Sequence, residues 1–269
     1  MKNPGLFNKC HAKIRIFLPY VALLGRNPNM FFSLITKASF SQFEKELNEA
    51  LIGNPSNHNY FIYNKKLFPR FQLFQRFQII TSFFPEKLEN LLDIGSCRGF
   101  YALKAADHPS CNVSVGIDVY EPFITISQKI KAYLNAEKVQ FHLATLDEIC
   151  NNGERYGGPF QVVLLLGTYH YLFWGSSKCS NAFHSHREIL SRLSKICSGR
   201  IIFSARLETN LLPRSIKKRA EMYKDKYAYT THDFFECAKE YFDIHKAGYL
   251  DKNLLLVMMK KGSSPVRCI

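Results

Sequence analysis

The chain has 269 residues, of which 46% are hydrophobic and 14% are aromatic, enough to bury one sizeable core. This composition excludes collagen-like, coiled-coil and largely disordered chains. The longest apolar run, residues 16–25, contains Pro19 and is shorter than the roughly 20 residues that cross a bilayer. The eight cysteines are scattered, without a C-x-x-C pair or zinc-ligand spacing, so we expect reduced thiols in a cytoplasmic protein.

The net charge of +14 is unevenly distributed along the chain. Residues 1–90 have 12 Lys and Arg against 5 Asp and Glu, residues 91–175 have 6 against 8, and residues 176–269 have 18 against 9. Basic flanks around a nearly neutral centre suggest an anionic partner beside the central part, either RNA or a small anionic molecule.

The first 43 residues contain no Asp or Glu, which is typical of a targeting sequence or of a basic helical extension. No A-x-A-like cleavage site follows the apolar run, which favours an extension. Further along, Leu67, Phe71, Phe74 and Phe77 recur at helical spacing among basic residues. This pattern predicts an amphipathic helix that packs on a sheet, with nucleobase stacking as the alternative. We therefore expect residues 1–84 to form a basic, mainly helical N-terminal extension.

From Leu91 onward, short apolar strands alternate with helical stretches, which is typical of a parallel sheet covered on both faces. Only residues 246–252 separate the last two strands, too few for a helical crossover, so these strands should form an antiparallel hairpin. We expect an α/β fold over residues 85–269, a doubly wound seven-stranded sheet with five parallel strands and that hairpin. The predicted strands are residues 90–94, 113–118, 139–143, 160–167, 200–205, 241–245 and 253–259.

The most informative segment is residues 91–101, LLDIGSCRGFY. A strand ends in Asp93, and glycines follow at Gly95 and Gly99, where a helix should begin. Glycines let the backbone approach a ligand closely. A dinucleotide site would place G-x-G-x-x-G directly after the strand. An acid that comes first suits a cofactor with a cationic amino-acid moiety, which points to S-adenosylmethionine.

This segment resembles the first motif of the class I S-adenosylmethionine-dependent methyltransferases, acid-x-Gly-x-Gly-x-Gly. Cys97 stands at the position of the middle glycine, and Ser96 completes the expected cofactor loop. The resemblance extends to Asp118, which ends the second strand 19 residues after Gly99. In the family, a carboxylate there accepts hydrogen bonds from both ribose hydroxyls, a strong bidentate contact.

Two further segments extend the resemblance. After the third strand the family often has an acid that contacts the adenine; here Thr145 takes that position, so the contact would fall to Asp147 or to backbone atoms near Leu146. The fourth strand continues into residues 167–172, GTYHYL, like the family's fourth motif. There the resemblance implies that Gly167 lies beside the methionine part of the cofactor. Tyr169, His170 and Tyr171 are the candidates for facing the acceptor, with His170 as the candidate general base.

The sequence lacks the residues that several specialised methylation reactions of nucleic acids require. The end of the fourth strand has no Asn/Asp-Pro-Pro-Tyr/Phe sequence for base amines and no cysteine to attack a pyrimidine, and the Lys-Asp-Lys-Glu set of ribose methylation is incomplete. The resemblance therefore implies direct methyl transfer from S-adenosylmethionine to O or N of a small acceptor that could be anionic. Two alternatives stay open: an RNA methyltransferase that uses the basic flanks, and an S-adenosylmethionine-binding protein without activity.

Overall fold

The computed structural model describes residues 40–52 and 58–262. It divides into two compact units, one that ends at Glu49 and one that begins at Ala50. Helix α3 (Gln42–Leu51) begins with a reciprocal cap, in which the N–H of Ser41 donates to Oε2 of Glu44 at 2.9 Å and the N–H of Glu44 donates to Oγ of Ser41 at 3.2 Å. The acid-free stretch that resembles a targeting sequence lies almost wholly outside the described residues.

The second unit begins with an element that the sequence did not predict. Strands β1 (Tyr60–Tyr63) and β2 (Lys66–Pro69) form a two-stranded antiparallel sheet, and α4 (Phe71–Thr81) follows. The helix expected to start near Leu67 therefore begins four residues later, because Leu67 pairs with Ile62 in the hairpin. The hairpin and α4 belong to the same compact unit as the main sheet.

The buried side of α4 also differs from the predicted aromatic stripe. Phe71 is 60% exposed, whereas Leu73, Arg76 and Ile80 are buried. Phe77 keeps part of the predicted packing, since its ring centroid lies 5.6 Å from that of Phe100. Arg76, one of the basic residues interleaved with the stripe, is nevertheless buried.

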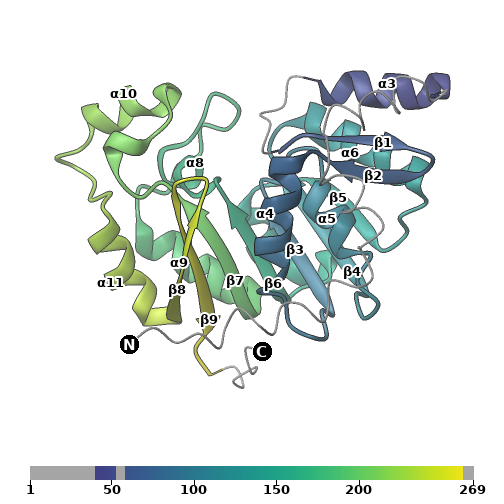
Figure 1. Ribbon diagram of the computed structural model, residues 1–269. Helices are drawn as coiled ribbons and strands as arrows, with labels where there is room; N and C mark the ends of the chain where they lie inside the picture. The colour runs from purple at the N-terminus through teal and green to yellow at the C-terminus, as the bar shows by residue number, and fades with distance from the viewer. Residues whose placement is uncertain (1–39, 53–57, 263–269) are drawn as a thin grey trace, which may run out of the picture. The chain divides into compact units, whose positions relative to one another are not determined.

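The main sheet has the predicted seven strands, and its order is β5-β4-β3-β6-β7-β9-β8 (Figure 1). The first five strands in this order are parallel, and β9 pairs antiparallel with both β7 and β8, so the expected α/β fold is confirmed. The strands are β3 (Asn90–Ile94), β4 (Val113–Asp118), β5 (Val139–Leu143), β6 (Phe160–Leu166), β7 (Cys197–Ala205), β8 (Phe242–Leu250) and β9 (Asn253–Lys260).

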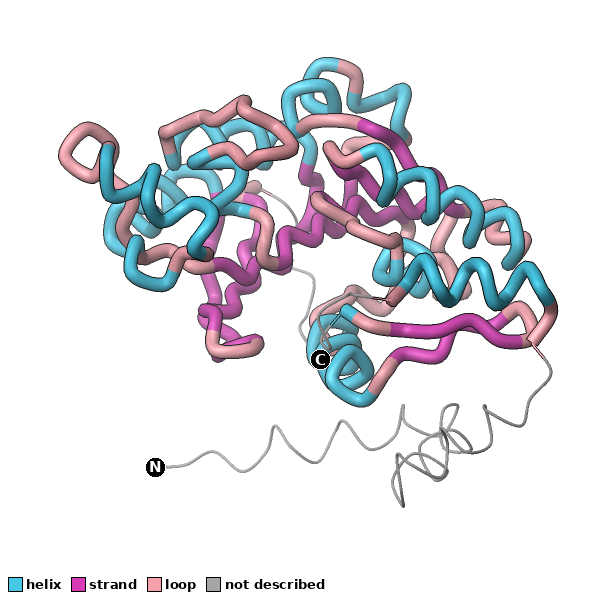
Figure 2. The backbone as a smooth tube through the Cα atoms, turned by 90° about the horizontal axis from the view of Figure 1, so that it is seen from above, coloured by secondary structure: helices cyan, strands magenta, loops and turns pink. Residues whose placement is uncertain are grey.

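Helices lie on both sides of this sheet, as Figure 2 shows from above. Thr230 caps helix α11 (Thr231–Tyr241) by accepting the N–H of Asp233 at 3.1 Å. The helices that follow the strands are α5 (Phe100–Ala105), α6 (Glu121–Leu134), α7 (Leu146–Asn151), α8 (Tyr169–Trp174), α9 (His186–Ile196), α10 (Arg214–Met222) and α11 (Thr231–Tyr241), with 3-10 turns η3 (Gly153–Tyr156) and η4 (Thr209–Leu211).

The C-terminal hairpin is tighter than expected. Strand β8 continues to Leu250, and the turn consists only of Asp251 and Lys252, at φ values of 47° and 69°. Two central residues with positive φ match the right-handed twist of the strands, although Asn-Gly is the usual pair. Since Leu254 pairs with Ala205, the last residue of β7, the turn lies at the carboxyl edge of the parallel strands.

The two faces of the sheet have different neighbours. One face packs its apolar side chains against α8, α9 and α11 in a single buried cluster; its strand members include Leu92, Val163, Leu165, Ile201, Phe203, Leu256 and Met258. Because side chains alternate along a strand, Asp93 points to the opposite face. It shares that face with Leu164, its partner on β6. The large core therefore lies behind the sheet, on the side away from Asp93.

Two sequence-based expectations can be checked over the described residues. The six cysteines among them are all free thiols, as predicted. None of the helices in the described ranges combines the length and the apolar character that crossing a membrane requires.

We predict that Phe203→Ala lowers the free energy of unfolding by about 3–5 kcal/mol, because it leaves a cavity between fully buried rings. The ring centroid of Phe203 lies 4.8 Å from that of Phe234 and 5.2 Å from that of Tyr169. Urea unfolding followed by circular dichroism measures the change. Phe71→Ala, the same substitution at an exposed site, is the control and should stay within about 0.5 kcal/mol of wild type. Equal losses in the two variants would contradict the assigned core.

Candidate functional site

Two neighbouring strands end in carboxyl groups at the same edge of the sheet. Asp93 and Asp118 lie on β3 and β4, which run parallel with Ile94 beside Ile117. Asp93 is only 3% exposed, and its Oδ2 has no hydrogen-bond partner among the described residues. A buried polar atom of this kind is a position where a ligand can supply the missing partner.

The loop after β3 closes tightly against its neighbours. The N–H groups of Gly95 and Ser96 both donate to the carbonyl of Ile117 at 2.9 Å, which holds the loop over the end of β4. Gly95 has a φ of 74°, and a Cβ there would lie 2.4 Å from Oγ1 of Thr168. Glycine is therefore required at this position both by conformation and by space, and the loop meets the exit of β6 here.

Cys97 and Asp118 connect the two acidic strand ends. Cys97 has a φ of 51°, a left-handed conformation that favours glycine, which the family motif has at this place. Its N–H donates to Oδ2 of Asp118 at 3.0 Å, while the N–H of Tyr120 donates to Oδ1 at 3.0 Å. Each carboxylate oxygen of Asp118 thus accepts one backbone hydrogen bond and keeps capacity for another.

Burial dominates the electrostatics of this loop. Burial, with a smaller contribution from the charge of Asp118, raises the pKa of Asp93 to about 7. Burial also raises the pKa of Asp118, while the hydrogen bonds from Tyr120 and Cys97 oppose that shift. The pKa of the Cys97 thiol rises to about 11, chiefly because it is buried, so it is a neutral thiol and not a nucleophile. The site therefore offers two carboxyl groups in surroundings that favour a cationic partner beside Asp93.

The exit of β6 contributes Gly167 and His170. A Cβ at Gly167, whose φ is 79°, would meet no atom of the described residues within 4 Å, so these residues leave space beside it. His170 is 3% exposed, and neither ring nitrogen has a hydrogen-bond partner among the described residues. Burial, with a smaller effect of Arg206, lowers the pKa of His170 to about 3, so the imidazole is neutral at physiological pH. A pKa this low makes His170 a weak base, so burial opposes the expected role in accepting a proton.

The structure does not bring Tyr169 into this site. Tyr169 is fully buried, and its hydroxyl lies 2.6 Å from Nδ1 of His186. Its ring packs edge-on against Phe203 and Phe234, within the core cluster. The first turn of α8 directs this side chain into the core, so the position does not support the expected role on the acceptor.

The region expected to contact adenine has its side chains engaged elsewhere. Thr145 caps α7, with its Oγ1 accepting the N–H of Glu148 at 3.3 Å and its N–H donating back to Oε2 of Glu148 at 2.7 Å. Asp147 pairs with Arg192 at 2.5 Å, and Leu146 is 2% exposed within the core cluster. Of the atoms predicted here, only backbone groups are suited to a ligand.

Two side chains that the sequence analysis missed reach the cofactor loop from the N-terminal hairpin and α4. Tyr60 donates its hydroxyl hydrogen to the carbonyl of Arg98 at 2.5 Å, and Nε of Arg76 donates to the hydroxyl of Tyr101 at 3.4 Å. These contacts join elements about 25 to 40 residues apart along the chain, so no local pattern indicates them. The one available signal was that Arg76 lies three residues after Leu73 and four before Ile80, on their face of α4.

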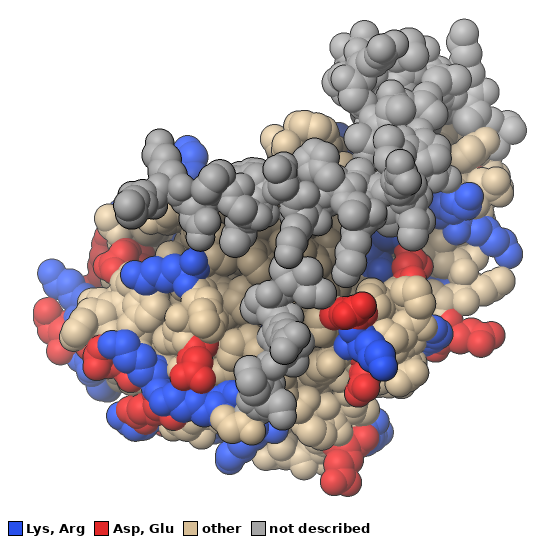
Figure 3. Space-filling view, turned by 60° about the horizontal axis from the view of Figure 1, so that its bottom comes forward, with Lys and Arg blue, Asp and Glu red and all other residues tan. Residues whose placement is uncertain are grey.

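The basic stretch after β7 is partly engaged within the protein. In α10, Arg219 donates to the carbonyl of Trp174 at 2.7 Å, and Lys217 lies 3.9 Å from Glu221. On the face shown in Figure 3, Lys and Arg side chains of the described residues lie among Asp and Glu side chains. Neither observation indicates a continuous basic surface over the described part of that face.

Comparison with known proteins gives matches only among solved structures. No protein-family model matches the sequence, and no curated protein does. The N-terminal domain of EvdMO1, solved with SAH bound, is similar over 81% of this chain and 95% of its own length, at 12% identity and a TM-score of 0.53. WbdD, described as a bifunctional kinase-methyltransferase, is similar over 69% of this chain, at 16% identity and a TM-score of 0.50.

The chain matches only part of the larger neighbours. It spans about 40% of the length of WbdD and 47% of the length of full EvdMO1. At these identities the likeness concerns the fold. The strand order, the antiparallel C-terminal hairpin and the glycine loop between the first sheet strand and its helix agree with it. Together they show that this chain has the fold of the class I S-adenosylmethionine-dependent methyltransferases.

Proposed function

We propose that this protein is an S-adenosylmethionine-dependent methyltransferase that acts on O or N of a small, anionic acceptor. The observation that carries the proposal is the pair of acids at the ends of β3 and β4. Asp93 is a buried carboxyl group with one oxygen that no described residue pairs, and Asp118 holds the loop between them through the N–H of Cys97. The SAH bound to the N-terminal domain of EvdMO1, a structural neighbour, supports the same cofactor class.

The residues fit the parts of such a cofactor. Asp93 would accept hydrogen bonds from the ammonium group, because its unpaired oxygen lies in a site that burial has stripped of water. The hydroxyl of Ser96 is likewise buried without a partner among the described residues, and it would contact the same end of the cofactor. Gly95 and Gly99 would let the methionine part approach the backbone, with Cys97 lining the loop between them. Gly167 borders open space on the opposite side.

The nucleoside would lie over the ends of the next strands. The two carboxylate oxygens of Asp118 would each accept one ribose hydroxyl, since each has one backbone hydrogen bond and a remaining lone pair. The adenine would contact the backbone N–H of Leu146, because both the side chain and the N–H of Thr145 are used in the cap of α7. The N–H groups in the first turn of a helix have no partner within that helix and can donate to a ring nitrogen.

The reaction would be a direct displacement. When bound, S-adenosylmethionine supplies an activated methyl group that a lone pair of the acceptor can attack. The protein contributes alignment of the two reactants and exclusion of water, which account for much of the rate in such reactions. His170, whose ring nitrogens have no partner among the described residues, would orient the acceptor through a hydrogen bond, and the proton that the acceptor loses would pass to solvent.

The first test is binding. Calorimetric titration should show binding of both S-adenosylmethionine and S-adenosylhomocysteine. We predict that Asp118→Ala weakens both by about 1.5–3 kcal/mol, because a charge-assisted hydrogen-bond pair is lost. Asp118→Asn, which keeps the shape but not the charge, should lose part of this. Asp225→Ala, which removes an exposed carboxylate between α10 and α11, is the matched control and should bind like wild type.

Absence of binding in the wild-type protein would overturn the proposed function. An unchanged dissociation constant in Asp118→Ala would remove Asp118 from the site. Binding without methyl transfer from labelled cofactor to any acceptor in a panel of carboxylate- and phosphate-bearing small molecules would favour the cofactor-binding protein without activity.

A second prediction concerns pH. Because the pKa of Asp93 is raised to about 7, the carboxyl group is mostly protonated at pH 6 and mostly ionised at pH 8. The ammonium group pairs with the ionised form, so binding should release a proton and the affinity for S-adenosylhomocysteine should rise as pH increases. The expected gain between pH 6 and pH 8 is up to about tenfold. Calorimetry in buffers of different ionisation enthalpy measures both the affinity and the released proton.

Asp93→Asn is the control for this pH dependence. The amide cannot ionise, so the variant should bind more weakly at pH 8 and show a nearly flat profile from pH 6 to pH 8. A wild-type profile that stays flat, or a slope of equal size in the variant, would show that Asp93 does not carry the contact.

A further inference from the structure

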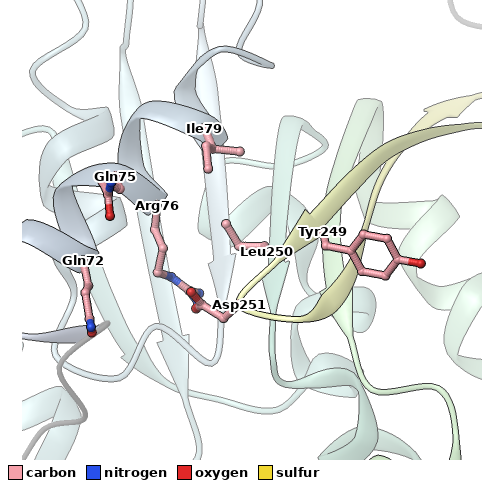
Figure 4. A pocket seen from close by; sticks show the side chains of 7 residues that line it. All are labelled: Gln72, Gln75, Arg76, Ile79, Tyr249, Leu250 and Asp251. Atoms are coloured by element: carbon pink, nitrogen blue, oxygen red, sulfur yellow. The ribbon is translucent and has the colours of Figure 1, made fainter.

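A hollow outside the acidic loop lies between α4 and the turn of the C-terminal hairpin. Its volume is about 620 Å³, within the range of about 300–1,000 Å³ that is usual for small-molecule sites. One face of α4 supplies Gln72, Gln75, Arg76 and Ile79, at the spacing of successive helical turns. The hairpin supplies Tyr249, Leu250 and Asp251, and Figure 4 shows Arg76 reaching toward Asp251 while the ring of Tyr249 points away from α4.

The hollow lies at the edge of the sheet where the proposed cofactor site lies. Leu250 pairs with Asn253, and the adjacent Leu254 pairs with Ala205 at the end of β7. The carboxyl ends of the parallel strands are therefore beside the hairpin turn. β9 is three strand spacings from β3, or about 14 Å. In open α/β sheets, ligands bind outside this edge, and the two sites are close enough for one small acceptor to reach from one to the other.

Among the described residues, Arg76 is the only cationic side chain that lines the hollow, and it is unusually buried for an arginine. The residue is 6% exposed. Removing a guanidinium group from water is costly unless anions or hydrogen-bond acceptors compensate for the lost hydration. Its Nε contacts the hydroxyl of Tyr101, and its Nη1 pairs with Asp251. A guanidinium group has five N–H donors in a planar fork, so these two contacts leave capacity for a further anion.

The pairing of Arg76 with Asp251 indicates that this guanidinium group binds anionic groups. A carboxylate occupies one side of the guanidinium group, and its side chain is 39% exposed against 7% for Arg76. The anion of the pair thus stays close to solvent while the cation is held in the protein. Asp251 is positioned by a turn in which both residues have positive φ, including Lys252 where glycine is usual. An incoming carboxylate or phosphate can bind Arg76 beside Asp251 or displace Asp251. Displacement costs Asp251 little, because its carboxylate is already close to solvent.

Tyr101 connects Arg76 to the cofactor loop. It lies in the first turn of α5, two residues after Gly99, and it is 6% exposed. Burial raises the pKa of its hydroxyl group, the charge of Arg76 opposes this shift and the charge of Asp93 adds to it, so both charged groups lie near Tyr101. A ligand anion on Arg76 would therefore be joined to the proposed methyl-transfer site through a single buried side chain.

We propose that this hollow is the acceptor site and that Arg76 binds the carboxylate or phosphate group of the acceptor, with Asp251 as the counter-ion that the acceptor competes against. This inference rests on the proposed function, because the bound anion is a methyl acceptor only if the protein is a methyltransferase. It adds the chemical class of the group that is recognised and the residue that recognises it.

The test uses three aromatic probes of similar size in ligand-observed NMR titrations of the full chain: benzoate, phenyl phosphate and the neutral benzamide. We expect benzoate or phenyl phosphate to bind the wild-type protein and benzamide to bind at least tenfold more weakly. Arg76→Gln should weaken anion binding at least tenfold. Asp251→Asn should strengthen it about three- to tenfold, because the competing carboxylate is gone while the cation remains. The preferred probe distinguishes a carboxylate from a phosphate.

Two controls separate this proposal from the proposed function. Lys252→Gln removes a positive charge from the same turn but outside the lining of the hollow, and it should bind the anions like wild type. Calorimetry with S-adenosylhomocysteine on every variant reports the cofactor site independently. If S-adenosylhomocysteine fails to bind the wild-type protein while Arg76 still governs the anions, the proposed function fails and the anion site stands.

The acceptor proposal is overturned if neither anion binds, or if Asp251→Asn does not tighten anion binding. It is also overturned if a folded Arg76→Gln binds the anions like wild type, or if Lys252→Gln loses as much affinity as Arg76→Gln. Should Arg76→Gln fail to fold, the Asp251→Asn result decides alone, since a merely structural ion pair predicts no gain in anion affinity when its carboxylate is removed.

Discussion

The hydrogen bond from the N–H of Cys97 to the carboxylate of Asp118 joins the two strands on which the proposed site depends. It holds a non-glycine residue in a left-handed conformation that costs about 1–2 kcal/mol on its own. It also turns the loop over the end of β4, where the carbonyl of Ile117 accepts two further N–H groups. With the loop fixed in this way, Asp93 remains buried beneath it with one oxygen unpaired among the described residues.

The two faces of the sheet differ in role: one packs the hydrophobic core and the other carries the residues of the proposed site. Behind it, the aromatic and aliphatic cluster around Phe203 packs against α9 and α11. In front, the same strands carry Asp93 and border the hollow that contains Arg76. Tyr169 and His170 show how sharp this division is. They are neighbours in sequence, yet the hydroxyl of Tyr169 bonds to His186 within the core, while the ring nitrogens of His170 are unpaired among the described residues.

Buried groups of opposite charge lie at two places along the carboxyl edge of the sheet. The acidic pair favours a cation, because burial makes an isolated carboxylate beside Asp118 costly and an ammonium group would relieve that cost. Arg76, also buried, favours an anion. A zwitterionic arrangement of this kind would orient a cationic cofactor and an anionic acceptor toward the space between them, and would discourage either ligand from occupying the other's place.

Much of this arrangement was predictable from local pattern. Alternating strands and helices predicted the seven-stranded sheet, because apolar runs and their spacing reflect burial on two faces. The loop of residues 93–99 and Asp118 were identifiable because glycine placement and an acid at a strand end are backbone requirements that sequence records directly. The tight turn at Asp251 was not predictable, since a two-residue turn without glycine gives no composition signal.

The sequence by itself determined the order of strands and helices and the positions of the two acids, since both depend on residues close together in the chain. The tertiary structure alone decided which side chains face that site. It placed Tyr169 in the core, used Thr145 as a helix cap, and brought Arg76 to Tyr101 and Asp251 from elements 25 and 175 residues away. Such contacts depend on how helices pack against an open sheet, and no local pattern records the energy of that packing.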